Sequence, residues 1–466
     1  MESPQSTKHL TVPPLKESVP AEAVKSTAGF AVPVAGGGNH ALATDSVDFI
    51  NPKPIPPDSF PDAPIGDSKL LPATIANVRH LLQSYRITVQ YDEIKKRMTI
   101  RIPGYAGAPD NADEVAVAHI YSLANLNGLS TNQLLNYVSA IGDANRINRV
   151  ANWIECKQWD GQDRLPAFYD TLEHRPDFSQ QLKEILMYRW LLSAVAAVMK
   201  PSGFRNRGVL TIQGPQSIGK TTWISNLVSD DLLRDDFVKL DHHLDAGNKD
   251  SLLTAIAHWI VEIGELDSSF KKDIARLKGF LTTDRDKVRR PYGRTDSEYP
   301  RRTVFCATVN DQSFLIDSTG NTRWWTIPVT AVNHTHRIDM QQLFAQVAID
   351  FRNGEQWWLT QAEEACLESY NANHRVITAI GERVLGALDL SRVGAPDLPA
   401  MTPTELLGKI GVNNPSNTNC KDCAAVLREH LGDSKRINGL NKWRVPLKQE
   451  TWAANLRPNQ RPDDRF

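Results

Sequence analysis

The chain has 466 residues, enough for about three domains of roughly 100 to 200 residues each. Lysine plus arginine (53) nearly balance aspartate plus glutamate (54), so any surface for a polyanion must be local. Five scattered cysteines favour a reducing compartment over a disulfide framework. The N-terminus lacks the apolar core of a signal peptide, and no run reaches the ~18 apolar residues of a membrane helix, so we expect a cytoplasmic protein with no membrane partner.

The first third of the chain predicts an arm and a small domain. Residues 1–68 are rich in Pro, Gly and Ser and show no sustained period, which predicts a disordered arm. Apolar residues at helical spacing follow from Ile75 to Leu82, and the alternating runs of "ITVQYDEIKKRMTIRI" predict a hairpin. With the helical patterns after them, residues 69–177 predict a small mixed α/β leader domain.

The middle of the chain alternates between helical and strand patterns. A long amphipathic helix from Phe178 leads into the apolar strand "GVLTIQG". Because strands then alternate with helices, we expect a parallel, doubly wound sheet over residues 178–372. The segments expected to form strands are "FVKL", "HWIVEI", "RTVFCATVN" and "RWWTIPV".

The end of the chain predicts a separate unit. Two helical patterns, "TPTELLGKIG" and "CKDCAAVLREHLG", precede a basic ribbon that turns at Asn438-Gly439. A helix pair before such a ribbon predicts a winged-helix domain over residues 373–448. Residues 449–466 are expected to be a flexible tail.

The stretch "GPQSIGKT" fits G-x-x-x-x-G-K-[ST], with an apolar strand before it and a helix after it. In such a phosphate loop, Lys220 would neutralise the β and γ oxygens of a nucleotide and Thr221 would ligate Mg²⁺. We therefore expect ATP and Mg²⁺ as cofactors. The residues expected around the phosphates are Gly214, Pro215, Gln216, Ser217, Ile218, Gly219, Lys220, Thr221 and Thr222.

The strand "HWIVEIGELD" carries two acids, Glu262 and Glu265. A phosphate loop needs a carboxylate at the end of a second strand to hold the metal. We assign Glu262 to Mg²⁺ and Glu265 to orienting the attacking water, although the two roles could be exchanged. The alternative is two exposed loop acids.

Two further polar residues follow strand patterns. Asn310 ends "FCATVN", where motor-type ATPases place a sensor of the γ-phosphate, an element that nucleotide kinases lack. Arg323 precedes two tryptophans and either packs on them or reaches the γ-phosphate of its own or a neighbouring subunit.

The segment from Lys271 to Arg302 holds 11 basic and 5 acidic residues, a net charge of +6 in an otherwise neutral chain. Basic residues interleaved with a tyrosine suit a loop that follows phosphates and stacks a base. The alternative is a solvated face whose arginines pair with neighbouring acids. The candidate DNA contacts are Lys287, Arg289, Arg290, Tyr292 and Arg294.

With these residues in view, the central region resembles the virulence-associated protein E family, phage-type ATPases similar to superfamily 3 helicases. The resemblance implies a P-loop NTPase core of the additional-strand, AAA+-like type, a homo-oligomeric ring, and the roles assigned above to Lys220, Glu262 and Asn310. Superfamily 3 helicases usually place two acids side by side, whereas Ile263 and Gly264 separate them here. The resemblance rests on "GPQSIGKTTW", "HWIVEIGELD", "ARLKGFLTTDRDKVRRPYGR", "PRRTVFCATVND" and "FLIDSTGNTRWWTIPV".

The resemblance implies a replicative, helicase-like ATPase of a phage or integrated element that acts on DNA, most simply single-stranded DNA. Relatives are often fused to a primase, but the first 200 residues show no acidic primase constellation, so we expect any primase or replication partner to be a separate protein. One alternative is an ATP-dependent DNA-binding switch or assembly factor without unwinding activity. Another is a small-molecule kinase, which the strand that ends at Asn310 disfavours.

Overall fold

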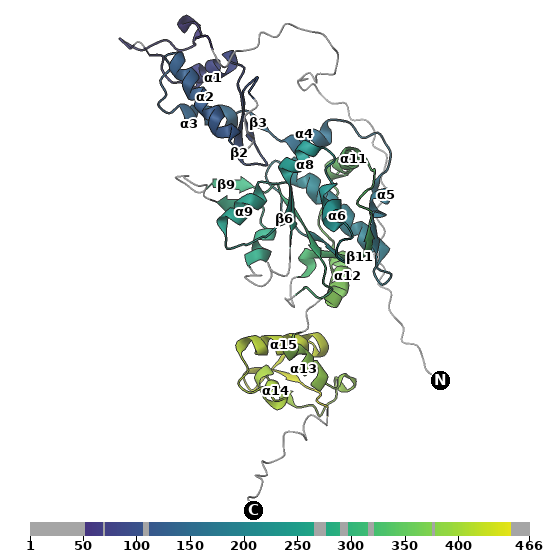
Figure 1. Ribbon diagram of the computed structural model, residues 1–466. Helices are drawn as coiled ribbons and strands as arrows, with labels where there is room; N and C mark the ends of the chain where they lie inside the picture. Colours follow the sequence, from purple (N-terminus) through teal and green to yellow (C-terminus); the bar gives the residue numbers. More distant parts are fainter. Residues whose placement is uncertain are drawn as a thin grey trace, which may run out of the picture. The chain divides into compact units, whose positions relative to one another are not determined.

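The computed structural model describes residues 52–68, 70–105, 111–264, 276–288, 297–315, 321–374 and 378–448. These residues form an α/β fold in two compact units (Figure 1). The first lies within Met1–Asn310 and Arg323–Leu367, and the second within Asp311–Thr322 and Glu368–Phe466. In the described part of the chain, no helix is long and apolar enough to cross a membrane.

The first unit begins with a small sheet in the order β2-β1-β3. The predicted hairpin is present, because β1 (Thr88–Asp92) pairs antiparallel with β2 (Arg97–Arg101), and β3 (Arg146–Ile147) lies parallel to β1. The helices α1 (Ile75–Ser84), α2 (Ala112–Leu126) and α3 (Leu134–Asp143) complete the domain. These elements share a hydrophobic core of their own, which runs from Phe60 to Val138.

The predicted arm is too long at its C-terminal end. Phe60 is 6% exposed and packs into the core of the leader domain. The backbone N–H of Ile55 donates to Oδ1 of Asn127 at 2.6 Å, and Pro57–Ser59 form the short helix η1. A single anchoring aromatic carries no periodic signal, which explains the error. Residues 1–51 of the predicted arm and the predicted tail, residues 449–466, lie outside the described residues.

A six-stranded sheet forms the centre of this unit, in the order β4-β11-β5-β10-β7-β6. Five strands are parallel, as the sequence predicts, and β4 is antiparallel at one edge. The strands β5 and β7 are buried along their length, which is why they read as continuous apolar runs. The strands are β4 (Leu172–His174), β5 (Val209–Gln213), β6 (Val238–His242), β7 (Ile260–Ile263), β10 (Val304–Val309) and β11 (Trp324–Val332).

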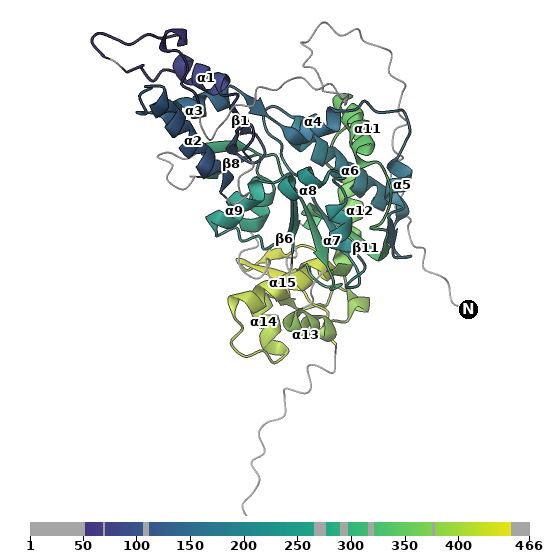
Figure 2. The ribbon, with the colours of Figure 1, turned by 45° about the horizontal axis from the view of Figure 1, so that its top comes forward.

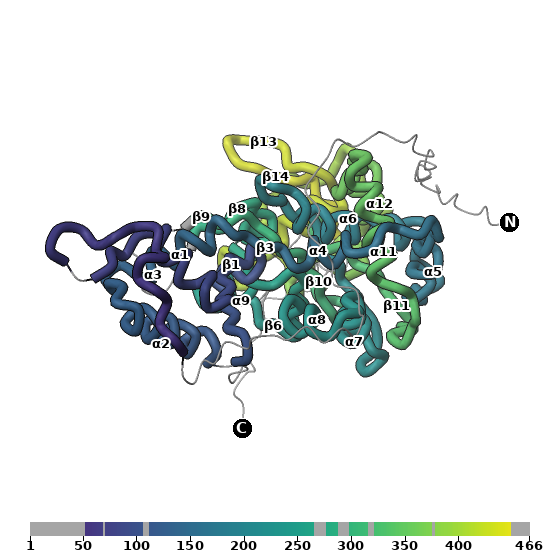
Figure 3. Tube along the Cα trace, turned by 90° about the horizontal axis from the view of Figure 1, so that it is seen from above, coloured from purple at the N-terminus to yellow at the C-terminus, as the bar shows by residue number. Residues whose placement is uncertain are grey.

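Helices connect and cover these strands. Figures 1 and 3 place the leader domain at one end of the unit and α5 with β11 at the other. The helices are α4 (Arg149–Glu155), α5 (Leu165–Tyr169), α6 (Gln180–Met199), α7 (Lys220–Ser225), α8 (Asp231–Phe237), α9 (Lys249–Ile256), α11 (Met340–Arg352) and α12 (Gln361–Asn371). Because β4 already belongs to the central sheet and α4 packs on α11, the central domain begins before the predicted boundary at Phe178.

The predicted amphipathic helix is present as α6, but it is buried on all sides. Two charged residues within it are satisfied internally. Lys183 donates to the carbonyl of Leu172 at 2.9 Å, and Arg189 donates to the carbonyl of Gln356 at 2.6 Å. In the sequence these two charged residues make the helix look amphipathic. In the structure both side chains are buried and stabilise the fold.

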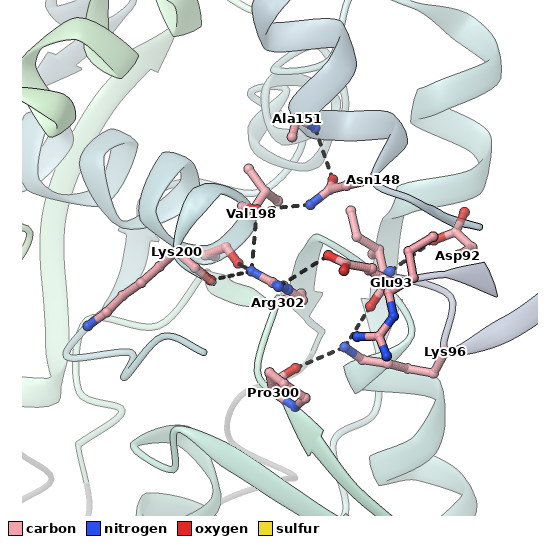
Figure 4. Close-up of polar contacts among 12 residues, drawn as sticks. Asp92, Glu93, Lys96, Asn148, Ala151, Val198, Lys200, Pro300 and Arg302 are labelled. Carbon is pink, nitrogen blue, oxygen red and sulfur yellow. Dashed lines mark hydrogen bonds and ion pairs between the residues drawn. The ribbon is translucent and has the colours of Figure 1, made fainter. Parts of the chain in front are cut away.

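Polar contacts join the leader domain to the central domain (Figure 4). Lys96, in the turn between β1 and β2, donates to the carbonyls of Glu93 at 2.7 Å and Pro300 at 2.9 Å. Arg302 donates to the carboxylate of Glu93 at 3.2 Å and to the carbonyl of Lys200 at 2.5 Å. Burial, reinforced by the charge of Arg302, lowers the pKa of Lys96 to about 7.

A two-stranded hairpin is inserted between β7 and β10. It consists of β8 (Arg285–Val288) and β9 (Ser297–Pro300), which pair antiparallel. The second unit contains α13 (Ala379–Ala387), α14 (Pro403–Lys409), α15 (Asn417–Leu431) and a sheet in the order β12-β14-β13. The predicted ribbon is present, because β13 (Lys435–Ile437) and β14 (Leu440–Arg444) turn at Asn438-Gly439, while β12 (Ala400–Met401) was not predicted.

Candidate functional site

The glycine-rich loop runs from Gly214 to Gly219 between β5 and α7. Figure 2 shows α7 beside β6, near the carboxyl ends of the parallel strands. Gly219 has φ +90°, and a Cβ on it would lie 2.3 Å from Nδ1 of His334. A Cβ on Gly214 would lie 2.5 Å from the carbonyl oxygen of Val329. Gly219 is therefore favoured by its conformation and by space, and Gly214 by space alone.

Lys220 is the first residue of α7 and is 6% exposed. Its Nζ donates three hydrogen bonds, to the carbonyls of Gly214 at 2.8 Å and Pro215 at 2.7 Å and to Oδ1 of Asn310 at 2.9 Å. Burial lowers the pKa of Lys220, and the charge of Glu262 opposes this shift. All three acceptors are neutral, so the ammonium group is held in place without being neutralised by them.

Glu262, in β7, is 1% exposed and accepts three hydrogen bonds. Its Oε1 accepts from the hydroxyls of Thr221 at 2.7 Å and Thr308 at 2.8 Å. Its Oε2 accepts from the backbone N–H of Asp241 at 3.2 Å. Neither Thr308 nor Asp241 is predicted from the sequence. Thr308 could have been found, because it stands two residues before Asn310 on one strand and so shares its face.

The strand order brings these side chains together. β10 lies between β5 and β7, so Asn310, which follows β10, lies beside the glycine-rich loop. The carboxyl ends of parallel strands are where open α/β sheets bind ligands. Lys220 and Thr221 of α7, Glu262 of β7 and Asn310 after β10 thus form one cluster.

The cluster fits a nucleotide with Mg²⁺. A hydroxyl and a carboxylate are hard oxygen ligands of the kind Mg²⁺ prefers. An ammonium group that donates only to neutral acceptors beside a glycine-rich loop suits phosphate. Across the described ranges, no group of three or more His, Cys, Asp or Glu forms a ready-made metal cage. Mg²⁺ needs none when substrate phosphates and water complete its shell.

Arg323 is not part of this cluster. It ends the short helix η2 (Asn321–Arg323) directly before β11. The next residue, Trp324, is paired with Val209, the first residue of β5. Arg323 therefore lies at the amino ends of the strands, opposite the glycine-rich loop, and its expected reach to the site of its own chain is wrong. A role in a neighbouring subunit's site remains a proposal.

Only part of the basic segment can be placed. Lys287 is exposed on β8, whereas Arg289, Arg290, Tyr292 and Arg294 lie outside the described residues, as does Glu265. Three other basic residues of the segment are buried, namely Lys278, Arg301 and Arg302.

Arg301 is a structural residue. It is fully buried and binds Asp286 through two hydrogen bonds, Nε to Oδ2 at 2.7 Å and Nη2 to Oδ1 at 2.5 Å. Its guanidinium also lies 4.4 Å from the ring centroid of Phe280. Together with the contacts of Arg302 to Glu93, this means that part of the segment's positive charge is used inside the fold.

Comparison with known proteins supports the resemblance seen in the sequence. Residues 154–376 match the virulence-associated protein E-like domain. No curated protein matches the chain. An apo structure of the C-terminal region of NrS-1 is similar over 80% of this chain and 98% of that chain, with 11% identity and a TM-score of 0.40. A second apo structure of that region covers the same shares at 12% identity, with a TM-score of 0.38.

Proposed function

Because residues 154–376 of this chain belong to the virulence-associated protein E-like domain family, we propose that the chain is a Mg²⁺-dependent P-loop ATPase that acts on DNA. The observation that carries the proposal is the cluster at the carboxyl ends of the strands. There a buried lysine donates only to neutral oxygens, and a threonine and a glutamate share a hydrogen bond of 2.7 Å.

Each residue of the cluster has a role in this proposal. Lys220 binds the β- and γ-phosphates, and Asn310, which already holds its Nζ, senses the γ-phosphate. Thr221 and Glu262, which are hydrogen-bonded to each other, would hold Mg²⁺ and its water shell. When bound, Mg²⁺ would neutralise charge that develops on the phosphate oxygens.

The strand order supports a motor-type core over a kinase. A strand inserted between the phosphate-loop strand and the acid strand is the additional-strand arrangement, and β10 occupies that place here. The polar residue at its end supplies an element that nucleotide kinases lack. We therefore propose an AAA+-like core that acts as a replicative helicase of a phage or integrated element.

DNA binding and assembly are proposed from separate features. The hairpin of β8 and β9 carries the exposed Lys287 toward the segment with Arg289, Arg290, Tyr292 and Arg294, and we propose single-stranded DNA as its ligand. In a ring, Arg323 would serve the site of the neighbouring subunit. We also propose that the second unit is a winged helix, which the helices α13, α14 and α15 and the three-stranded sheet support.

A second candidate is an ATP-dependent switch or assembly factor that binds DNA without unwinding it. The same ATP site and the same hairpin serve both functions. Strand separation by the purified protein distinguishes the two, because only the helicase couples turnover to unwinding.

Equilibrium binding of a fluorescent ATP analogue, with and without Mg²⁺, tests the ATP site. We expect Lys220→Ala to weaken binding by about 10²-fold, because it removes the cation that faces the phosphates. Lys157→Ala is the matched control, since Lys157 is an exposed lysine in the loop after α4. Equal affinity of Lys220→Ala and the wild type would overturn the proposed site.

A further inference from the structure

The proposed site has one buried acid, Glu262, and a second acid beside it. The sequence suggests Glu265 as the second acid, but the structure brings another carboxylate next to Glu262. It belongs to Asp241, in β6, which lies beside β7 in the sheet. The backbone N–H of Asp241 donates to Oε2 of Glu262 at 3.2 Å.

A bulge turns Asp241 toward this side of the sheet. Lys239 stands opposite Val261 and His242 opposite Ile263, so two residues of β6, Leu240 and Asp241, face the single Glu262. In unbroken pairing Asp241 would stand opposite Ile263 and point to the other face, because side chains alternate. Bulges of this kind commonly re-aim a side chain beside an active site.

The surroundings of Gly264 show that the carboxylate of Asp241 lies on the same face of the sheet as Glu262. Gly264 is two residues after Glu262, and its N–H bonds to the carbonyl of His242, so the pairing continues to this point. A side chain here would share the face of Glu262. The space is taken by Asp241 instead, since a Cβ on Gly264 would lie 1.9 Å from its Oδ1.

The backbone of Asp241 is also unusual. Its φ is +48°, a left-handed conformation that few residues other than glycine adopt and that Asp and Asn tolerate best. The residue is exposed, whereas its neighbour Glu262 is 1% exposed and fully engaged by Thr221, Thr308 and the Asp241 N–H. The carboxylate of Asp241 is thus open to solvent at the rim of the cluster.

From this geometry we propose that Asp241 is the catalytic base, the role that the sequence suggests for Glu265; the proposal rests on the ATPase function proposed above. Asp241 accepts a proton from the attacking water. The water oxygen bonds to the γ-phosphorus while the bond from that phosphorus to the β–γ bridging oxygen breaks. ADP and inorganic phosphate leave, and the proton passes from Asp241 to solvent.

The test separates nucleotide binding from turnover in three variants of the full chain. Asp241→Asn keeps the shape and tolerates the same φ. We expect it to bind the ATP analogue within about threefold of the wild type while kcat falls by about 10²-fold or more. Glu265→Gln should keep a kcat within about threefold of the wild type. Asp235→Asn, an exposed aspartate on α8, is the matched control.

A kcat of Asp241→Asn within about threefold of the wild type, or loss of its ATP binding with the fold intact, overturns the proposal. If Asp241→Asn does not fold, Gly264→Ala decides, because its methyl group displaces the carboxylate but leaves it in the chain. Full turnover of a folded Gly264→Ala variant would then overturn the proposal that Asp241 is the catalytic base. Failure of the proposed function looks different, since the wild type itself would show no Lys220-dependent ATP binding.

Discussion

The cluster around Lys220 and the base of the hairpin around Arg301 both bury a cation, but they hold it differently. Lys220 donates to two carbonyls and an amide oxygen, all neutral. Arg301 is bound by the carboxylate of Asp286 through two hydrogen bonds. A buried charge needs a partner, and Arg301 has a permanent one. Lys220 keeps its charge for an anionic ligand, which is why the first site suits phosphate and the second supports the fold.

Removing the partner of Arg301 should give the largest effect. We expect Asp286→Ala to lower the free energy of unfolding by about 3–5 kcal/mol, because it leaves a buried, uncompensated guanidinium. Urea denaturation measures this, with Asp284→Ala as control, since Asp284 is an exposed aspartate one residue before the hairpin. Equal stability of Asp286→Ala and Asp284→Ala would contradict the structural role of the Arg301–Asp286 pair.

The two threonines that donate hydrogen bonds to Glu262 give a second test, because only one of them is proposed to bind the metal. Thr221 and Thr308 donate to the same Oε1, but only Thr221 follows the glycine-rich loop. We expect Thr221→Ala to lower kcat by about 10²-fold, because it removes a metal ligand, and Thr308→Ala to lower it by less than about tenfold. Steady-state ATPase rates at several Mg²⁺ concentrations measure both effects. An equal loss of kcat in the two variants would contradict the assignment of the metal to Thr221.

Lys96 offers a third buried cation, bound by two carbonyls and close to Arg302. Its pKa is lowered to about 7, so between that pH and its ordinary value of 10.5 the unfolded chain binds a proton that the folded chain does not. Stability should therefore rise with pH in this window, by up to about 1.4 kcal/mol per pH unit.

Unfolding measured from pH 7 to pH 10 tests this slope, with Lys96→Met as the comparison. The substitution removes the titrating group, so the slope should fall to that of the remaining groups. An unchanged slope would show that Lys96 titrates normally.

The smallest effect is expected at Lys287, an exposed residue within the basic segment. Lys287→Ala should leave the free energy of unfolding unchanged and reduce the salt dependence of single-stranded DNA binding by about one counterion. Fluorescence anisotropy at several salt concentrations measures it. A large loss of stability would instead place Lys287 with Arg301 among the structural residues.

Much of the fold and part of the candidate site follow from local sequence. The loop at Lys220, the strand of Glu262 and the strand before Asn310 each carry their own pattern, and the parallel arrangement follows from strand and helix alternation. Residues that depend on pairing between distant strands do not. Asp241 reaches Glu262 only through a bulge between β6 and β7, and Arg323 is placed by the register of β11 against β5.

Charge counts fail for a related reason. The sequence counts Arg301 and Arg302 as part of a basic surface, but both are buried. The partner of Arg302, Glu93, lies 209 residues away along the chain and outside the counted segment. Composition cannot show which basic residues are already neutralised. It therefore overstates the charge available to DNA.

The ATPase rate with and without single-stranded DNA tests the central claim most directly. It should be measured for the wild type, for Lys220→Ala and for a variant with Lys287, Arg289 and Arg290 all changed to Ala. We expect DNA to raise the wild-type rate, the triple variant to lose only that rise, and Lys220→Ala to lose turnover altogether. A rate that depends on Lys220 but ignores DNA would contradict the claim that this ATPase acts on DNA.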